Sequence, residues 1–169
     1  MSAELTLGRH RDFDFYHIRG SGAADSLGGR YDTLPDRWFR YQQIEGGGFL
    51  ARLGDREFYI FGPVGTLPDK KTFGTDTFVF PRSDAVFFLN GNASAAFLCE
   101  LCAYDFSTSE PEEFILANMA GVSCWFRMSA AQPMQVLMGC DPSYGDYIAD
   151  TLTRTLSEFL SECRRKEMT

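Results

Sequence analysis

A thirteen-residue pattern that occurs twice constrains the fold of this chain more than any single residue does. Residues 15–27 (Phe-Tyr-His-Ile-Arg-Gly-Ser-Gly-Ala-Ala-Asp-Ser-Leu) align without a gap with residues 86–98 (Val-Phe-Phe-Leu-Asn-Gly-Asn-Ala-Ser-Ala-Ala-Phe-Leu). Each copy has a strand-like run, a glycine, a helix start built from small residues, and a leucine seven positions after the glycine. Strand–glycine–helix turns are also common in unrelated proteins, which is the alternative explanation. If the pattern reflects a duplication, the chain consists of two similar halves.

Strand-like segments follow both copies. After the first, residues 37–44 open a strand region, and residues 49–53 and 57–61 flank Gly54-Asp55-Arg56 as a predicted β-hairpin. After the second, we predict three antiparallel strands at 114–118, 122–128 and 134–139. The polar segment between the two sets, residues 62–75, reads as an exposed connection. In the first copy Ser21 is suited to cap the helix, and in the second copy we expect a capped helix over residues 90–103. The segment around His10 reads as irregular. We therefore predict one domain over residues 1–169, with repeated halves at about 12–65 and 77–165.

The composition favours a strand-rich protein with a substantial core. Aromatic residues make up 15% of the 169 residues, and 16 of them are Phe, which favours half-buried pleated surfaces. The apolar fraction of 44% and the charged fraction of 23% are typical of a globular domain. The predicted fold class is α+β, with two pseudo-duplicated halves that each contain an antiparallel sheet and a helix.

The last predicted element is a long amphipathic helix. Asp141 is suited to the N-cap and Pro142 to the first helical position. The closing basic residues 164–166 suit the negative end of the helix dipole. Apolar residues recur every three or four positions at Tyr144, Ile148, Leu152, Leu156, Leu160 and Cys163.

The charge balance and the apolar runs bear on partners and location. The chain has 16 basic and 23 acidic residues, a net charge of −7, which disfavours nucleic acid and anionic membranes as partners. It has no run of 18 apolar residues, so no membrane-spanning helix is expected. The first ten residues lack the pattern of a secretory signal, and we expect a cytoplasmic protein.

The cysteines give the nearest approach to a metal or redox motif. Five cysteines in a chain without an export signal are expected to be reduced. Cys99-Glu-Leu-Cys102 has metal-like spacing, but His10 and His17 are far away in sequence, and zinc needs four ligands. Core packing, a redox pair and a metal site remain open for Cys99 and Cys102. We expect no metal site, because core packing is the favoured interpretation of both residues.

The remaining catalytic motifs are missing from the sequence. It contains no Gly-x-Ser-x-Gly nucleophile elbow, no complete Gly-x-Gly-x-x-Gly loop after a strand and no Walker loop. We therefore assign no catalytic residue. This result favours a binding or accessory protein over an enzyme that acts alone.

Four stretches resemble a known superfamily. They are residues 52–60 (a Leu-Gly-Asp-Arg-Glu-Phe hairpin), 88–107 (strand, Gly and leucine-containing helix), 116–127 (hairpin) and 136–152 (strand and final helix). In order and spacing they resemble the folate-binding aminomethyltransferase-like superfamily, which includes the glycine cleavage T-protein. In particular they resemble the gamma subunits of heterotetrameric sarcosine oxidases. The resemblance covers roughly residues 12–160.

The resemblance implies a function more specific than the residues alone do. Gamma-type subunits are short companions of larger flavin- and folate-carrying subunits, so it implies a non-catalytic accessory subunit of a complex that oxidises N-methyl amines. The alternative is a stand-alone protein that binds tetrahydrofolate or another pterin, as a homo-oligomer. In that case Glu57 would read the amino-pyrimidine edge of the pterin and Arg127 would face its glutamate tail. Exposed turn chemistry for Glu57 and a rim ion pair for Arg127 remain open. A third hypothesis is a thiol-active protein based on Cys99 and Cys102.

Overall fold

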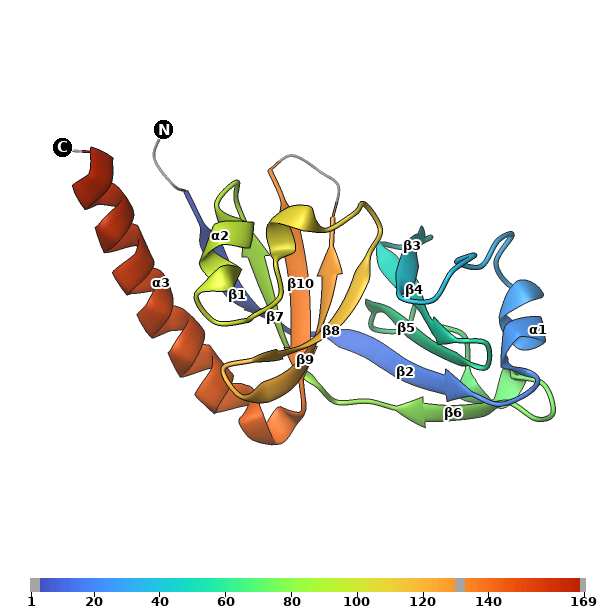
Figure 1. Cartoon of the computed structure of the whole chain (residues 1–169). Coiled ribbons are helices and arrows are strands. Elements are labelled where there is room, and N and C mark those ends of the chain that lie inside the picture. The colour runs from blue at the N-terminus through green and yellow to red at the C-terminus, as the bar shows by residue number, and fades with distance from the viewer. Residues whose placement is uncertain (1–3, 130–132, 168–169) are drawn as a thin grey trace. The chain divides into compact units, whose positions relative to one another are not determined.

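The computed structural model describes residues 4–129 and 133–167 (Figure 1). The chain divides into two compact units, each built around one five-stranded sheet. The β2 unit comprises residues 11–83 and 112–114, and the β7 unit comprises the described residues of 1–10, 84–111 and 115–169. The two sheets and the C-terminal helix confirm the predicted α+β class.

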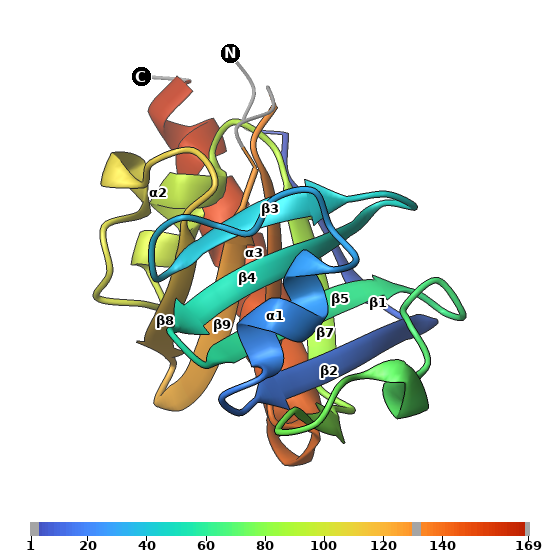
Figure 2. The ribbon, with the colours of Figure 1, turned by 90° about the vertical axis from the view of Figure 1, so that its right-hand side faces the viewer.

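The β2 unit holds a sheet in the order β3-β4-β5-β2-β6, with every pair of neighbours antiparallel. Helix α1 lies across the face formed by β2, β4 and β5 (Figure 2). The hairpin of β4 and β5 around residues 54–57 is the one predicted from the sequence. The elements are β2 (Phe13–Arg19), α1 (Ala23–Gly28), β3 (Arg40–Ile44), β4 (Gly48–Gly54), β5 (Glu57–Pro63), the 3-10 helix η1 (Lys70–Thr72) and β6 (Phe78–Pro81).

The β7 unit holds a sheet in the order β1-β7-β10-β9-β8. Helices α2 and α3 pack on one of its faces, where Phe97 of α2 contacts Phe159 of α3 with ring centroids 5.7 Å apart. Asp141 caps a short 3-10 helix at the entrance to α3 by accepting a hydrogen bond from the Ser143 amide. The elements are β1 (Thr6–His10), β7 (Ala85–Asn90), α2 (Ser94–Cys99), η2 (Phe106–Thr108), β8 (Phe114–Met119, with Phe114 grouped in the β2 unit), β9 (Val122–Met128), β10 (Gln135–Cys140), η3 (Pro142–Tyr144) and α3 (Gly145–Glu167).

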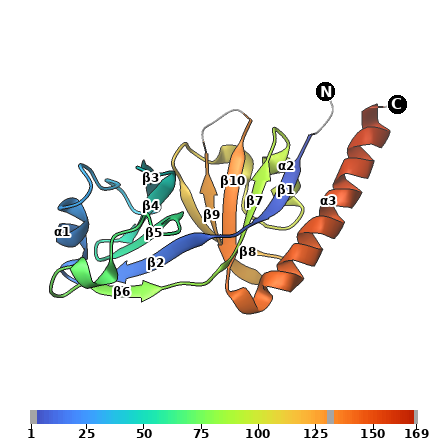
Figure 3. The same cartoon turned by 180° about the vertical axis from the view of Figure 1, so that it is seen from behind.

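The two sheets have the same topology with one exchange. If β2 is equated with β7, then β3, β4 and β5 correspond to β8, β9 and β10 in both order and connectivity. The strand that comes directly before each repeat does not pair with the first strand of that repeat. It pairs with the first strand of the other repeat, in the other sheet. Strand β1 comes directly before β2 but lies beside β7, and β6 comes directly before β7 but lies beside β2 (Figure 3).

The glycines of the repeated pattern occupy equivalent turns. Gly20 and Gly91 follow β2 and β7 and have positive φ angles of 123° and 140°. A Cβ on Gly20 would lie 2.1 Å from the Asp76 carbonyl oxygen, and one on Gly91 would lie 2.1 Å from the Glu4 carbonyl oxygen. Asp76 and Glu4 each stand two residues before an exchanged strand. The sequence repeat thus corresponds to a repeated backbone arrangement that includes the exchanged strand.

Successive side chains of a strand point to opposite faces of its sheet. In each unit, the side chains on one face form a core with the helices of that unit. In the β2 unit, Ile18, Leu50, Phe58 and Ile60 are fully buried against Leu27 of α1. The equivalent leucine in the β7 unit is Leu98, which is fully buried as well. It belongs to a core that includes Leu89, Phe126, Met138, Ile148 and Leu152.

Three local expectations were wrong. The segment around His10, read as irregular, forms strand β1, because its backbone pairs with β7 over residues 6–10. Ser21 does not cap α1, whose N-cap is Gly22 with no side-chain hydrogen bond. The helix expected over residues 90–103 is limited to Ser94–Cys99. Its N-cap, Ala93, provides no side-chain cap.

Candidate functional site

The two predicted binding residues lie in different units. Glu57 is the first residue of β5 in the β2 unit. Arg127 lies in β9 of the β7 unit, opposite Leu137 of β10. Their roles remain predictions.

Glu57 belongs to an ordered set of side chains on one face of the β5, β2 and β6 strands. Directly opposed residues of antiparallel strands project to the same face, so the register defines rows of neighbours. We call these the three cross-strand rows. They are Glu57–Arg19–Phe78, Tyr59–His17–Phe80 and Phe61–Phe15–Arg82, the last closed by a hydrogen bond from the Arg82 amide to the Phe15 carbonyl.

The closest polar contact in these rows joins a histidine to the predicted carboxylate. His17 Nε2 lies 2.7 Å from Glu57 Oε1, across the diagonal between the first two rows. Arg19 Nε lies 3.8 Å from the same oxygen. Among the described residues, Glu57 Oε2 has no polar partner, and the Glu57 side chain is 36% exposed. This oxygen can accept a hydrogen bond from a ligand or a partner chain without breaking the existing contact.

Burial and the Glu57 carboxylate shift the pKa of His17 in opposite directions. Desolvation lowers the pKa of His17 below the usual value of 6.5, because it disfavours the charged imidazolium. The hydrogen bond and the charge of Glu57 raise the pKa of His17 but do not cancel the effect of burial. The ring also contacts Tyr59 edge-on, with centroids 4.9 Å apart. His17 is therefore a largely neutral imidazole near pH 7.

Replacing Glu57 with Gln should lower the pKa of His17 further. The substitution removes the negative charge that favours the imidazolium and leaves the desolvation in place. The pKa can be measured from the NMR shifts of the His17 ring over a pH series, with His17→Gln used to assign the signal. A rise in the pKa of His17 in the Glu57→Gln variant would contradict the described contact.

Arg82 and Tyr59, which belong to neighbouring rows, contact each other. The Arg82 guanidinium lies over the rings of Tyr59 and Phe15, 4.9 and 5.3 Å from their centroids. Arg82 Nη1 also donates to the Tyr59 hydroxyl at 3.0 Å. Tyr59 is buried, whereas Phe78 and Phe80 are 59% and 51% exposed. The rows therefore run from a fixed aromatic interior on β5 to exposed rings on the edge strand β6.

Trp125 precedes Arg127 by two residues on the same face of β9 and makes a buried polar contact. Trp125, two residues before Arg127 in β9 and thus on the same face, donates its Nε1–H to the buried carboxylate of Asp84 at 2.8 Å. The Trp125 ring lies over Gly139 of β10, where a Cβ would be only 2.4 Å from the ring. The Trp125–Asp84 contact was not predicted, because Asp84 stands 41 residues earlier in the chain.

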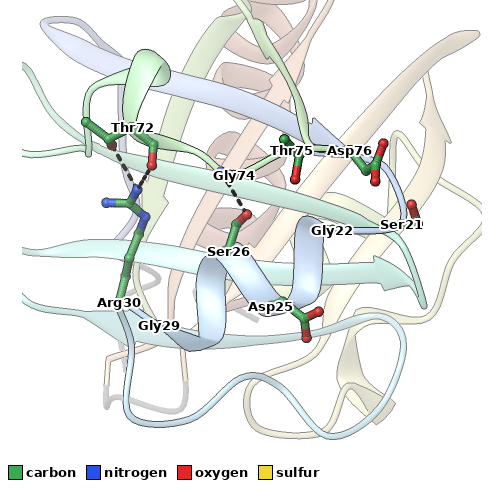
Figure 4. Close-up of a pocket in the computed structure, with 10 residues that line it drawn as sticks. All are labelled: Ser21, Gly22, Asp25, Ser26, Gly29, Arg30, Thr72, Gly74, Thr75 and Asp76. Atoms are coloured by element: carbon green, nitrogen blue, oxygen red, sulfur yellow. Dashed lines mark hydrogen bonds between the residues drawn. The ribbon is translucent and has the colours of Figure 1, made fainter.

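A polar hollow of about 680 Å³ lies between α1 and residues 72–76 (Figure 4). Arg30 Nη2 donates to the Thr72 carbonyl and hydroxyl oxygens at 2.5 and 2.8 Å, and the Gly74 amide donates to Ser26 Oγ at 3.2 Å. These contacts join the two walls of the hollow to each other. Neither Glu57 nor Arg127 lines it.

The thiol and metal hypotheses can be compared with the structure. Cys99 at the end of α2 is exposed and Cys102 is buried, so the expected core packing describes Cys102 but not Cys99. Across residues 4–129 and 133–167, no three His, Cys, Asp or Glu side chains are grouped so that they could hold a metal ion. In the same part of the chain, no helix has the length and apolar character needed to cross a membrane.

Comparisons with known proteins identify the fold. No family model matches the sequence, and no curated protein matches it. Among solved structures, the chain matches a chain of the heterotetrameric sarcosine oxidase from Corynebacterium sp. U-96, solved in complex with pyrrole 2-carboxylate. The TM-score is 0.77 at 17% identity, over 95% of this chain and 87% of the other.

The second match is the glycine cleavage system aminomethyltransferase T from Bartonella henselae. Its TM-score is 0.69 at 16% identity, over 89% of this chain and 45% of that chain. This chain therefore spans less than half the length of the aminomethyltransferase. Both matches agree with the resemblance inferred from the sequence. The chain has the fold that a sarcosine oxidase chain and aminomethyltransferase T share.

Proposed function

We propose that this protein is a non-catalytic accessory subunit of a cytoplasmic, flavin- and folate-dependent complex that oxidises an N-methyl amine. The observation that carries the proposal is the match to a chain of a heterotetrameric oxidase that is similar to this chain over almost the full length of both. Such coverage favours a subunit equivalent to the matched chain. In this assignment, flavin and the reacting amine belong to partner chains.

The surface of the β2 unit supports a role in assembly. Phe78 and Phe80 both project from the edge strand β6 on the face of the cross-strand rows, and more than half of each ring is exposed. Arg19, also exposed, and Glu57 lie in the same row as Phe78. Exposed aromatic rings beside paired charges are typical of the centre and rim of a protein interface. We assign this surface to contact with a larger flavoprotein subunit.

Co-purification tests the assignment. The tagged chain, expressed in its own host, should recover a flavin-containing oxidoreductase in a fixed ratio, identified by mass spectrometry and by flavin absorbance. The recovered complex should oxidise sarcosine or a related N-methyl amine, whereas the chain alone should not. Recovery of the chain only as a homo-oligomer would contradict the accessory role and favour the second candidate.

The second candidate is a stand-alone protein that binds tetrahydrofolate or another pterin. The observation that favours it is the available Oε2 of Glu57 beside exposed rings on β6. A carboxylate can accept hydrogen bonds from the amino-pyrimidine edge of a pterin while an aromatic ring stacks on its plane. These residues fit such a group chemically. Arg127 belongs to the other unit, and its role toward the glutamate tail stays a prediction.

Titration with tetrahydrofolate separates the two candidates. If the chain binds this ligand alone, protein fluorescence should change on titration, and both Glu57→Gln and Arg127→Gln should weaken the affinity by about tenfold, the loss of one charged hydrogen bond. Glu45→Gln, an exposed carboxylate on the same unit, is the matched control and should bind like the parent. No fluorescence change and no heat of binding with the parent protein would exclude the second candidate.

A further inference from the structure

Two cysteines that the functional hypotheses leave unused lie side by side in the sheet of the β7 unit. Cys124 of β9 and Cys140 of β10 are directly opposed in the antiparallel register. Both project into the core, with 5% and 2% of their surfaces exposed. Sixteen positions separate them in the chain, so only the strand pairing brings them together.

The phase of the backbone hydrogen bonds places this pair at a close position. The Ser129 amide donates to the Gln135 carbonyl, which marks 129–135 as a hydrogen-bonded pair. Hydrogen-bonded and non-hydrogen-bonded pairs alternate along an antiparallel ladder. Cys124–Cys140 lies an odd number of pairs away from 129–135, so it is a non-hydrogen-bonded pair. The Cα atoms of such pairs are about 4.5 Å apart, which falls within the range that a disulfide requires.

The side chains already interact in the reduced state. The Cys124 thiol forms a hydrogen bond with Cys140. This contact lowers the pKa of Cys140 and, as the largest cause, raises the pKa of Cys124, since Cys124 holds its proton as the donor. Arg9 also lowers the pKa of Cys140, while burial, Asp84 and Asp141 raise it. Cys140 is thus the sulfur of the pair that ionises first.

We propose that Cys124 and Cys140 form an oxidation site that closes to a cross-strand disulfide when the protein meets hydrogen peroxide. The Cys140 thiolate attacks one peroxide oxygen, the O–O bond breaks, and Cys140 becomes a sulfenic acid as hydroxide leaves. The Cys124 sulfur then attacks the sulfenic sulfur, the S–O bond breaks, and its proton leaves with the hydroxyl as water. The two sulfurs lose two electrons in total, and the peroxide gains them.

Peptide mapping of the full chain tests the proposal. The protein is treated with hydrogen peroxide, its remaining thiols are alkylated under denaturing conditions, and it is cut without reduction. Cleavage after Arg and Glu places Cys124 in 114–127 and Cys140 in 128–154, apart from Cys99 and Cys102. We expect the number of free thiols to fall from five to three and these two peptides to be joined.

Variants sharpen the same experiment. Cys163→Ala, at a partly exposed position outside the pair, should leave the crosslink unchanged. Cys124→Ala should remove it and leave Cys140 to gain oxygen atoms instead. A crosslink between other cysteines, or five free thiols in treated parent protein, would overturn the proposal. Because the parent chain alone gives this result, the proposal stays testable even if Cys124→Ala does not fold. It is also independent of the proposed function.

Discussion

A Phe78→Ser/Phe80→Ser double variant should bind the proposed oxidoreductase partner with an affinity about 100-fold below that of the parent. Both rings are more than half exposed on the edge strand β6, so the variant gives up little burial within its own unit. At an interface, burying two Phe rings contributes about 1.5 kcal/mol each, and the losses combine to about two orders of magnitude. Binding can be measured by interferometry with the purified partner.

The control for this prediction is another exposed apolar residue. Leu116 on β8 is 51% exposed, and Leu116→Ser should change the affinity several-fold at most. The double variant should also unfold near the denaturant concentration of the parent. If Leu116→Ser lost as much affinity as the double variant, or if the double variant bound like the parent, the surface of β6 would not be part of the interface.

The second large effect concerns the repeated glycines. Gly20→Ala and Gly91→Ala should each destabilise the fold by about 3 kcal/mol, because alanine is strained at positive φ and its Cβ would overlap a backbone carbonyl. For a chain of this size, that corresponds to a fall in Tm of roughly 6–12 °C. Urea unfolding followed by circular dichroism gives the free energy directly. The two effects should be similar, since the two turns have the same geometry.

Gly28 provides the matched control. It lies at the end of α1, and no atom outside its own helix backbone and chain neighbours would come within 4 Å of an added Cβ. Gly28→Ala should leave the free energy of unfolding unchanged or raise it by up to about 1 kcal/mol. If Gly20→Ala were as stable as Gly28→Ala, the described close approach of the Asp76 carbonyl oxygen to Gly20 would be wrong.

Local patterns predicted most of the elements, whereas the pairing of distant strands could not be predicted from them. The hairpin of β4 and β5, the repeated turns at Gly20 and Gly91, and helix α3 all follow from signals within a few residues. Strand β1 was missed because Thr6–His10 has a weak pattern of alternation. Its structure depends on the edge of β7, about 80 residues later in the chain.

The contacts of the candidate site also depend on strand pairing that local sequence patterns do not predict. Glu57 was selected as a candidate because it stands in a recognisable hairpin, but nothing nearby in the sequence identified His17 as its partner. The two residues are 40 positions apart, and they meet only because β2 and β5 pair in one particular register. A shift of that register by one residue would turn His17 to the opposite face. The Cys124–Cys140 pair depends in the same way on β9 and β10.

The exchanged edge strands also impose an order on synthesis and folding. Strand β1 leaves the ribosome before its partner β7, which follows only after the whole of residues 11–83 has been made. The β2 unit, in contrast, can assemble most of its sheet from consecutive residues. We infer that the nascent chain carries an unpaired N-terminal strand throughout this interval. Such a strand is a natural binding site for a chaperone, and a place where two nascent copies could exchange strands.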